Sequence, residues 1–136
     1  MKYLIILLFT ICYQQSFSQK IDWKNSDNWK IYRLRGHGLF SYSLDTLHLF
    51  KFYSLNADSM RKFVRDVLPV PNDSTPVWMG AYVATCSLDG KEVKVEISTY
   101  GGFFYCEADR EIYEIPAPLK NEWQDYIASC YHIVYP

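Results

Sequence analysis

Apolar residues recur at helical spacing in two segments of the chain, which predicts two amphipathic helices with one buried face each. The first lies between Asn56, which is suited to cap it, and Pro69, which is suited to end it. Its apolar positions are Met60, Phe63, Val64, Val67 and Leu68. The second begins near Pro118, and its apolar positions are Leu119, Trp123, Tyr126, Ile127 and Cys130.

Between these helices, apolar and polar side chains alternate, which predicts antiparallel strands with one buried face. Asp89 and Gly90 stand between two such runs and predict a two-residue hairpin turn. The resulting register pairs Leu88 with Lys91, Cys86 with Val93, Ala84 with Val95 and Tyr82 with Ile97. Lys94 and Glu96 then point away from the apolar face.

Gly101 and Gly102 predict a second two-residue turn, because glycine adopts positive φ angles without strain. Phe103 would begin the return strand, and Cys106 would lie opposite Ile97. A loop over residues 107–110 then leads into a further strand at "EIYEI". The segment after residue 80 is therefore expected to form a meander of three to four strands.

Residues 28–35 and 47–53 suggest two earlier strands, although their alternation is weaker. The resulting element order is two strands, a helix, a meander and a C-terminal helix. This order predicts an α+β fold: an antiparallel sheet of about four to six strands, with two helices packed on one face.

The N-terminus has the pattern of a secretory signal peptide. Lys2 precedes an apolar run over residues 3–13, and Ser16 and Ser18 suit cleavage before Gln19. An uncleaved membrane anchor would need a longer apolar span. We therefore expect a cleaved signal at 1–18 and a single domain at 19–136, exported to the periplasm or the extracellular space, with no stable membrane span.

Composition narrows the partners of the expected mature chain. Without Lys2, 13 basic residues face 15 acidic ones, and the basic residues are interleaved with acids. Nucleic acid is therefore not an expected partner, because its binding needs clustered Lys and Arg. Aromatic residues make up 18% of the chain, enough to supply a core and still leave rings on the surface.

Three cysteines follow the expected cleavage site. In an oxidising space we expect Cys130 to pair with Cys86 rather than with Cys106, because a helix returning from Pro118 would approach the Asp89 end of the sheet. No metal is expected, since the cysteines lie 20 and 24 residues apart without the close ligand pairs of a zinc site.

Candidate catalytic residues are few. His37 lies between two glycines and could expose an imidazole, with Ser43 or Asp45 nearby in sequence. No G-x-S-x-G motif is present to hold a serine nucleophile, and no glycine-rich loop has the signature of a phosphate site, so no cofactor is expected. His48 and His132 are interpreted as ordinary structural or surface residues. A small secreted hydrolase with a site around His37 is the alternative function.

Surface aromatics are the better functional indication, because such rings are enriched at interfaces. Trp23, Trp29, Tyr105 and Tyr113 are candidates, and the predicted binding residues are Tyr100, Gly101, Gly102 and Phe103. In outline, the chain resembles exported bacterial binding or inhibitor proteins, including immunity proteins that neutralise a toxin in the periplasm. This likeness of type assigns no residue a role. It favours a non-enzymatic module that binds a protein or envelope ligand.

Overall fold

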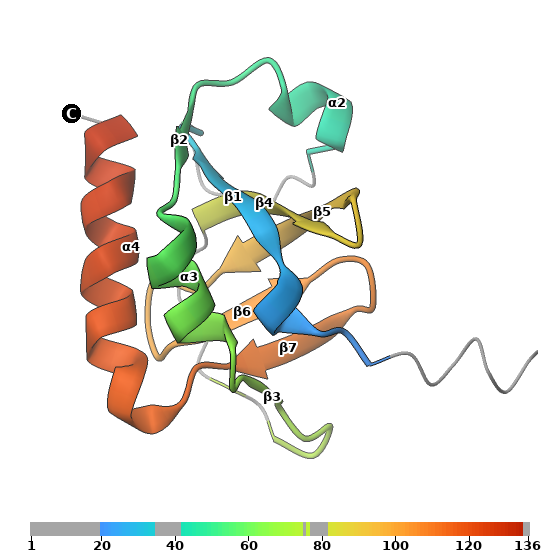
Figure 1. The fold of residues 1–136 in the computed structure, drawn as a ribbon, viewed down its shortest axis with the longest axis vertical. Helices are drawn as coiled ribbons and strands as arrows, with labels where there is room; N and C mark the ends of the chain where they lie inside the picture. Colours follow the sequence, from blue (N-terminus) through green and yellow to red (C-terminus); the bar gives the residue numbers. More distant parts are fainter. Residues whose placement is uncertain (1–19, 35–41, 75, 77–81, 135–136) are drawn as a thin grey trace, which may run out of the picture.

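The computed structural model describes residues 20–34, 42–74, 76 and 82–134, which build one antiparallel sheet with helices packed against it (Figure 1). The seven strands lie in the order β2-β1-β4-β5-β6-β7-β3. Their bounds are β1 (Asp27–Tyr32), β2 (Phe52–Ser54), β3 (Leu68–Pro69), β4 (Tyr82–Leu88), β5 (Lys91–Ile97), β6 (Phe103–Cys106) and β7 (Glu111–Glu114). The predicted α+β class is confirmed, with more strands than the four to six expected.

Helices α3 (Ala57–Val64) and α4 (Lys120–Val134) are the two predicted from sequence. Asn56 caps α3 as expected, since its Oδ1 accepts a hydrogen bond from the Ser59 backbone N–H at 2.9 Å. The α3 helix ends at Val64, earlier than the predicted end at Pro69, and Leu68 and Pro69 instead pair with β7 as the short strand β3. Two 3₁₀ turns, η1 (Trp23–Asn25) and η2 (Ala117–Leu119), precede β1 and α4. Within the described residues, no helix has both the length and the apolarity to cross a membrane.

The β4–β5 hairpin has the predicted register along its whole length, from Tyr82 opposite Ile97 to Leu88 opposite Lys91. Asp89 and Gly90 have φ angles of 51° and 76°. Positive angles at both central residues match a primed turn, whose twist fits the flanking strands. The local turn signal therefore determined the register.

The β5–β6 hairpin has a wider loop than predicted. The Ser98 N–H donates to the Phe103 carbonyl at 2.9 Å, and Ser98 Oγ bonds both the N–H and the carbonyl of Tyr100. Cys106 consequently lies opposite Val95 instead of Ile97. Because the shift is by two residues, each side chain keeps its predicted face.

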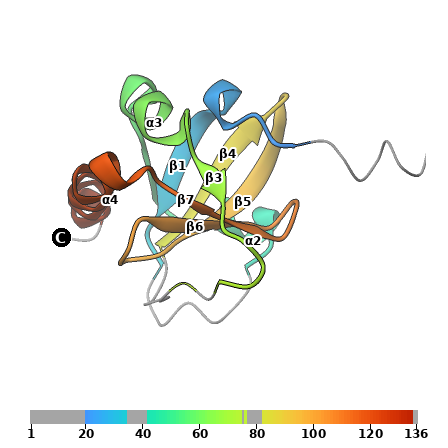
Figure 2. The same cartoon turned by 90° about the horizontal axis from the view of Figure 1, so that it is seen from below.

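The main core lies between one face of the sheet and the layer formed by α3, α4 and η1. Its largest fully buried side chains include Phe63, Phe104 and Trp123. The Phe104 ring contacts Trp123 at 6.3 Å and stacks on Tyr113 at 5.4 Å between centroids. Figure 2 shows that the sheet is strongly twisted, so β6 and β7 cross the direction of β1 and β4. Both predicted helices therefore cover the same face.

A smaller cluster lies on the opposite face, where Tyr32, Leu47 and Val83 are buried. Leu47 belongs to the short helix α2 (Leu44–Leu47), so the predicted strand over residues 47–53 is wrong in its first half. Ser43 Oγ accepts a hydrogen bond from the Thr46 N–H at 3.2 Å and caps this helix. Within this segment, the residues that pair with β1 are Phe52–Ser54, which form strand β2.

Candidate functional site

The β5–β6 hairpin presents the most exposed aromatic ring in the described part of the chain. Tyr100 is 57% exposed, at the loop that joins the two strands. Its backbone is held on both sides by Ser98 Oγ, at 2.8 Å and 3.3 Å. A ring on a restrained loop loses little conformational entropy on binding, which favours a contact role.

The strands beside this loop continue the surface. Phe103 pairs with Glu114, which in turn pairs with Leu68, so these three side chains form a row across β6, β7 and β3. The row lies on the face away from the main core, because the neighbouring residues of β6 and β7 fill that core. Leu68 is 66% exposed. Lys120 forms an ion pair with Glu114 and its Nζ lies 5.2 Å from the centre of the Phe103 ring.

We refer to Leu68, Tyr100, Phe103, Glu114 and Lys120 as the hairpin patch. It combines exposed apolar and aromatic side chains with one ion pair. This mixture is common in protein interfaces, where apolar anchors are surrounded by polar groups. Two of the four predicted binding residues, Tyr100 and Phe103, belong to it.

Gly102 has a structural role beneath the patch. It is buried, its carbonyl accepts a hydrogen bond from the Ile115 N–H at 2.8 Å, and its φ is +71°. A Cβ at this position would lie 2.8 Å from Lys120 Cγ. Gly101 also has a positive φ, of 82°. The two glycines therefore shape the loop, and Tyr100 supplies its exposed side chain.

The other aromatic candidates have different positions. Trp23, Trp29 and Tyr113 are 3%, 3% and 4% exposed, and their rings pack against Phe104 or one another in the main core. They are not surface residues, which corrects the interpretation made from sequence. Tyr105 is half-buried on the outer face of β6.

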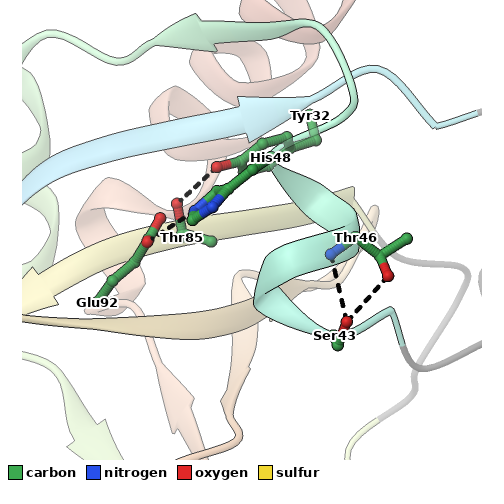
Figure 3. Close-up of polar contacts among 6 residues, drawn as sticks. All are labelled: Tyr32, Ser43, Thr46, His48, Thr85 and Glu92. Atoms are coloured by element: carbon green, nitrogen blue, oxygen red, sulfur yellow. Dashed lines mark hydrogen bonds and ion pairs between the residues drawn. The ribbon is translucent and has the colours of Figure 1, made fainter.

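Of the candidate hydrolase residues, Ser43 and Asp45 lie in the described part of the chain, at the start of α2. Ser43 and His48 flank opposite ends of α2, and Ser43 Oγ bonds Thr46 (Figure 3). His48 Nε2 instead lies 2.9 Å from Glu92 Oε2 on β5. The prediction for His37 lies outside the described residues, as does the predicted signal peptide at 1–18.

The predicted Cys86–Cys130 disulfide is absent, and Cys86, Cys106 and Cys130 are buried free thiols. The predicted direction of α4 was wrong. Tyr131, next to Cys130, packs on Tyr82 at 4.6 Å between ring centroids, at the end of β4 away from the Asp89 turn. Cys86 lies four residues from Tyr82, or about 13 Å further along β4 at strand spacing. The α4 helix therefore brings Cys130 to the end of β4 opposite the one expected.

Burial also makes these thiols poor nucleophiles. Desolvation raises the pKa of Cys106 to about 11, and burial likewise raises the pKa of Cys86 well above its usual range. A thiol in such surroundings stays protonated near neutral pH and is unreactive. No group of three or more His, Cys, Asp or Glu side chains in the described residues could hold a metal ion.

Lys94 is a buried charge that the sequence pattern placed on the solvent side. It is 6% exposed, and its Nζ donates to the Tyr42 carbonyl at 3.1 Å and pairs with Glu107 Oε2 at 2.9 Å. The alternation assigned its face correctly. That face is covered by the segment leading into α2, for which the sequence contained no signal.

No protein-family model matches this chain, and comparisons with curated proteins and with solved structures find no similar protein.

Proposed function

We propose that this protein is an exported, non-enzymatic binding or inhibitor-type protein that contacts a protein partner through the hairpin patch. The observation that carries the proposal is the exposed Tyr100 ring on a hydrogen-bonded hairpin loop, next to the Phe103–Glu114–Leu68 row. Export rests on the signal-like pattern of residues 1–18.

The patch suits a protein partner better than a small molecule. Small ligands are usually enclosed in concave sites, whereas Tyr100 and Leu68 project from the surface. A few central aromatic or apolar anchors can supply most of the energy of a protein interface. Tyr100 is the anchor we expect, with Phe103 and Leu68 beside it.

The proposal is tested by affinity capture from the protein's own cell envelope with the mature chain as bait. Tyr100→Ala should weaken capture of a specific partner by about 2 kcal/mol or more, which is roughly 30-fold, and leave the melting temperature nearly unchanged. Leu49→Ala is the matched control, because Leu49 is an apolar side chain 85% exposed outside the patch. It should leave capture unchanged.

Two results would contradict the proposal. One is equal capture by the wild-type chain and Tyr100→Ala. The other is a hydrolytic activity that His37→Ala removes while capture by Tyr100→Ala stays intact, which would favour the small secreted hydrolase.

A further inference from the structure

A groove of about 630 Å³ lies between helices α3 and α4, which are side by side over the main core (Figures 1 and 2). Side chains connect the two helices. The Phe63 ring of α3 lies 5.7 Å from the Tyr126 ring of α4 between centroids, and Lys62 forms an ion pair with Glu122 at 2.6 Å. The buried Phe63 and the half-buried Tyr126 give the groove an aromatic lining.

The groove carries an excess of negative charge. Its charged lining residues are Asp58, Lys62, Glu122 and Asp125. Three acidic residues less one basic residue leave a formal charge of −2. Asp125 and Tyr126 follow Glu122 by three and four residues, which places all three side chains on one face of α4. The helical spacing therefore brings carboxylates and an aromatic ring to the same wall.

The three carboxylates differ in what neutralises them. Glu122 pairs with Lys62, and Asp58 Oδ1 accepts a hydrogen bond from Arg61 at 3.1 Å. Asp125 is exposed and has no ion-pair or hydrogen-bond partner within the residues that the structure describes. It is therefore the carboxylate available to a cation from outside.

The groove already holds one cation of its own. Lys62 Nζ lies 5.8 Å from the centre of the Phe63 ring while it pairs with Glu122. Asp125 and Tyr126, which are adjacent on α4, offer the same combination of a carboxylate and an aromatic ring to a second cation. A guanidinium group suits this combination best, because it stacks on aromatic rings and pairs with carboxylates through two N–H groups.

We propose that the groove between α3 and α4 binds an arginine side chain in a basic segment of a partner protein. Asp125 would form the ion pair, and the Tyr126 ring would supply the stacking surface. The acidic side chains are widely exposed, Asp58 at 90% and Glu122 at 55%, whereas a small ligand is usually enclosed. The groove shares no residue with the hairpin patch, so the proposal does not depend on Tyr100.

The probe is the acetylated and amidated peptide Gly-Arg-Gly-Arg-Gly, and its matched control carries citrulline, a neutral isostere, in place of arginine. Binding is followed by amide NMR spectra of the mature chain during titration. The arginine peptide should shift the Asp125 and Tyr126 amide signals with a dissociation constant of about 1 mM, and the citrulline peptide should not. Binding should weaken as salt is added. Tyr100→Ala should bind the peptide as the wild type does.

Two pairs of variants separate the charge from the ring. Asp125→Asn keeps the shape, removes the charge and should weaken binding about fivefold, whereas the same change at Asp73, exposed in the loop after β3, should have no effect. Tyr126→Leu should weaken binding about threefold, and Tyr126→Phe, which keeps the ring, should change it by less than about twofold. Because Asp125 is exposed, Asp125→Asn keeps the test valid if Tyr126→Leu fails to fold.

Three outcomes would overturn the proposal. The first is an equal shift of the Asp125 and Tyr126 amide signals by the arginine and citrulline peptides. The second is wild-type affinity in Asp125→Asn. The third is a shift of the same signals by putrescine, which carries the same charge as the peptide, at a much lower concentration than the peptide requires. This third result would identify a free polyamine as the occupant.

Discussion

Replacing Gly102 with alanine should destabilise the fold more than the same change at Gly90. Both glycines have φ angles in the left-handed region, +71° and +76°, so each alanine variant should lose about 1–2 kcal/mol from its backbone alone. The surroundings differ. A Cβ at Gly90 meets nothing within 4 Å, whereas one at Gly102 would lie 2.8 Å from Lys120 Cγ.

The added cost at Gly102 follows from what Lys120 does. Moving its side chain disturbs the ion pair with Glu114 and the contact with the Phe103 ring. The ion pair is partly exposed and contributes at most about 1 kcal/mol, and the ring contact adds about 0.5 kcal/mol. Gly102→Ala should therefore cost about 1 kcal/mol more than Gly90→Ala.

Urea unfolding followed by tryptophan fluorescence measures both free energies, with the midpoint and the slope fitted for each variant. In a Lys120→Ala background, the difference between the two glycine variants should fall to near zero, because the clash and its partners are gone. Equal destabilisation of Gly102→Ala and Gly90→Ala in the wild-type background would refute the reasoning. It would mean that Lys120 moves aside without loss.

The remaining predictions concern the core and its buried titratable groups. Phe104→Ala should destabilise the protein by about 3–5 kcal/mol, against about 1 kcal/mol for the half-buried neighbour Phe103→Ala, as measured by urea unfolding. The three described cysteines should react with a thiol reagent only after unfolding, and native chain that reacts within seconds would contradict their burial. Burial raises the pKa of Cys106 to about 11 and also raises the pKa of Tyr113. In the unfolded chain both groups lose their protons at a lower pH. The free energy of unfolding should therefore fall as the pH rises from the unfolded pKa values through the folded pKa values. The melting temperature, followed by circular dichroism, should therefore fall between about pH 9 and pH 11, and a constant value would contradict this.

Local sequence signals predicted the parts of the fold that depend on neighbouring residues. Asp89 and Gly90 predicted the β4–β5 turn and register, and Asn56 predicted the start of α3. The stripe containing Trp123 correctly indicated the buried face of α4. Each of these features follows from backbone preferences or from side-chain periodicity within a few residues.

The candidate site was only partly predictable. Tyr100 flanks the two glycines that predict the turn, and the structure exposes its ring. Leu68 was expected on the buried face of α3, and its place beside Glu114 depends on pairing between β3 and β7. No local sequence signal indicated that Lys120 would belong to the hairpin patch, because it reaches the patch only when α4 packs at the end of the sheet.

The sequence by itself determined which residues alternate between faces, where the tight turn of the β4–β5 hairpin lies, and that two amphipathic helices cover a sheet. Only the tertiary structure decided the direction of α4 across β4, which keeps Cys130 away from Cys86. It also decided that the segment before α2 covers Lys94. In addition, it placed β2 at one edge of the sheet beside α4, and the proline-containing strand β3 at the other edge. These outcomes depend on contacts between residues far apart in the chain, and neither periodicity nor turn preference encodes such contacts.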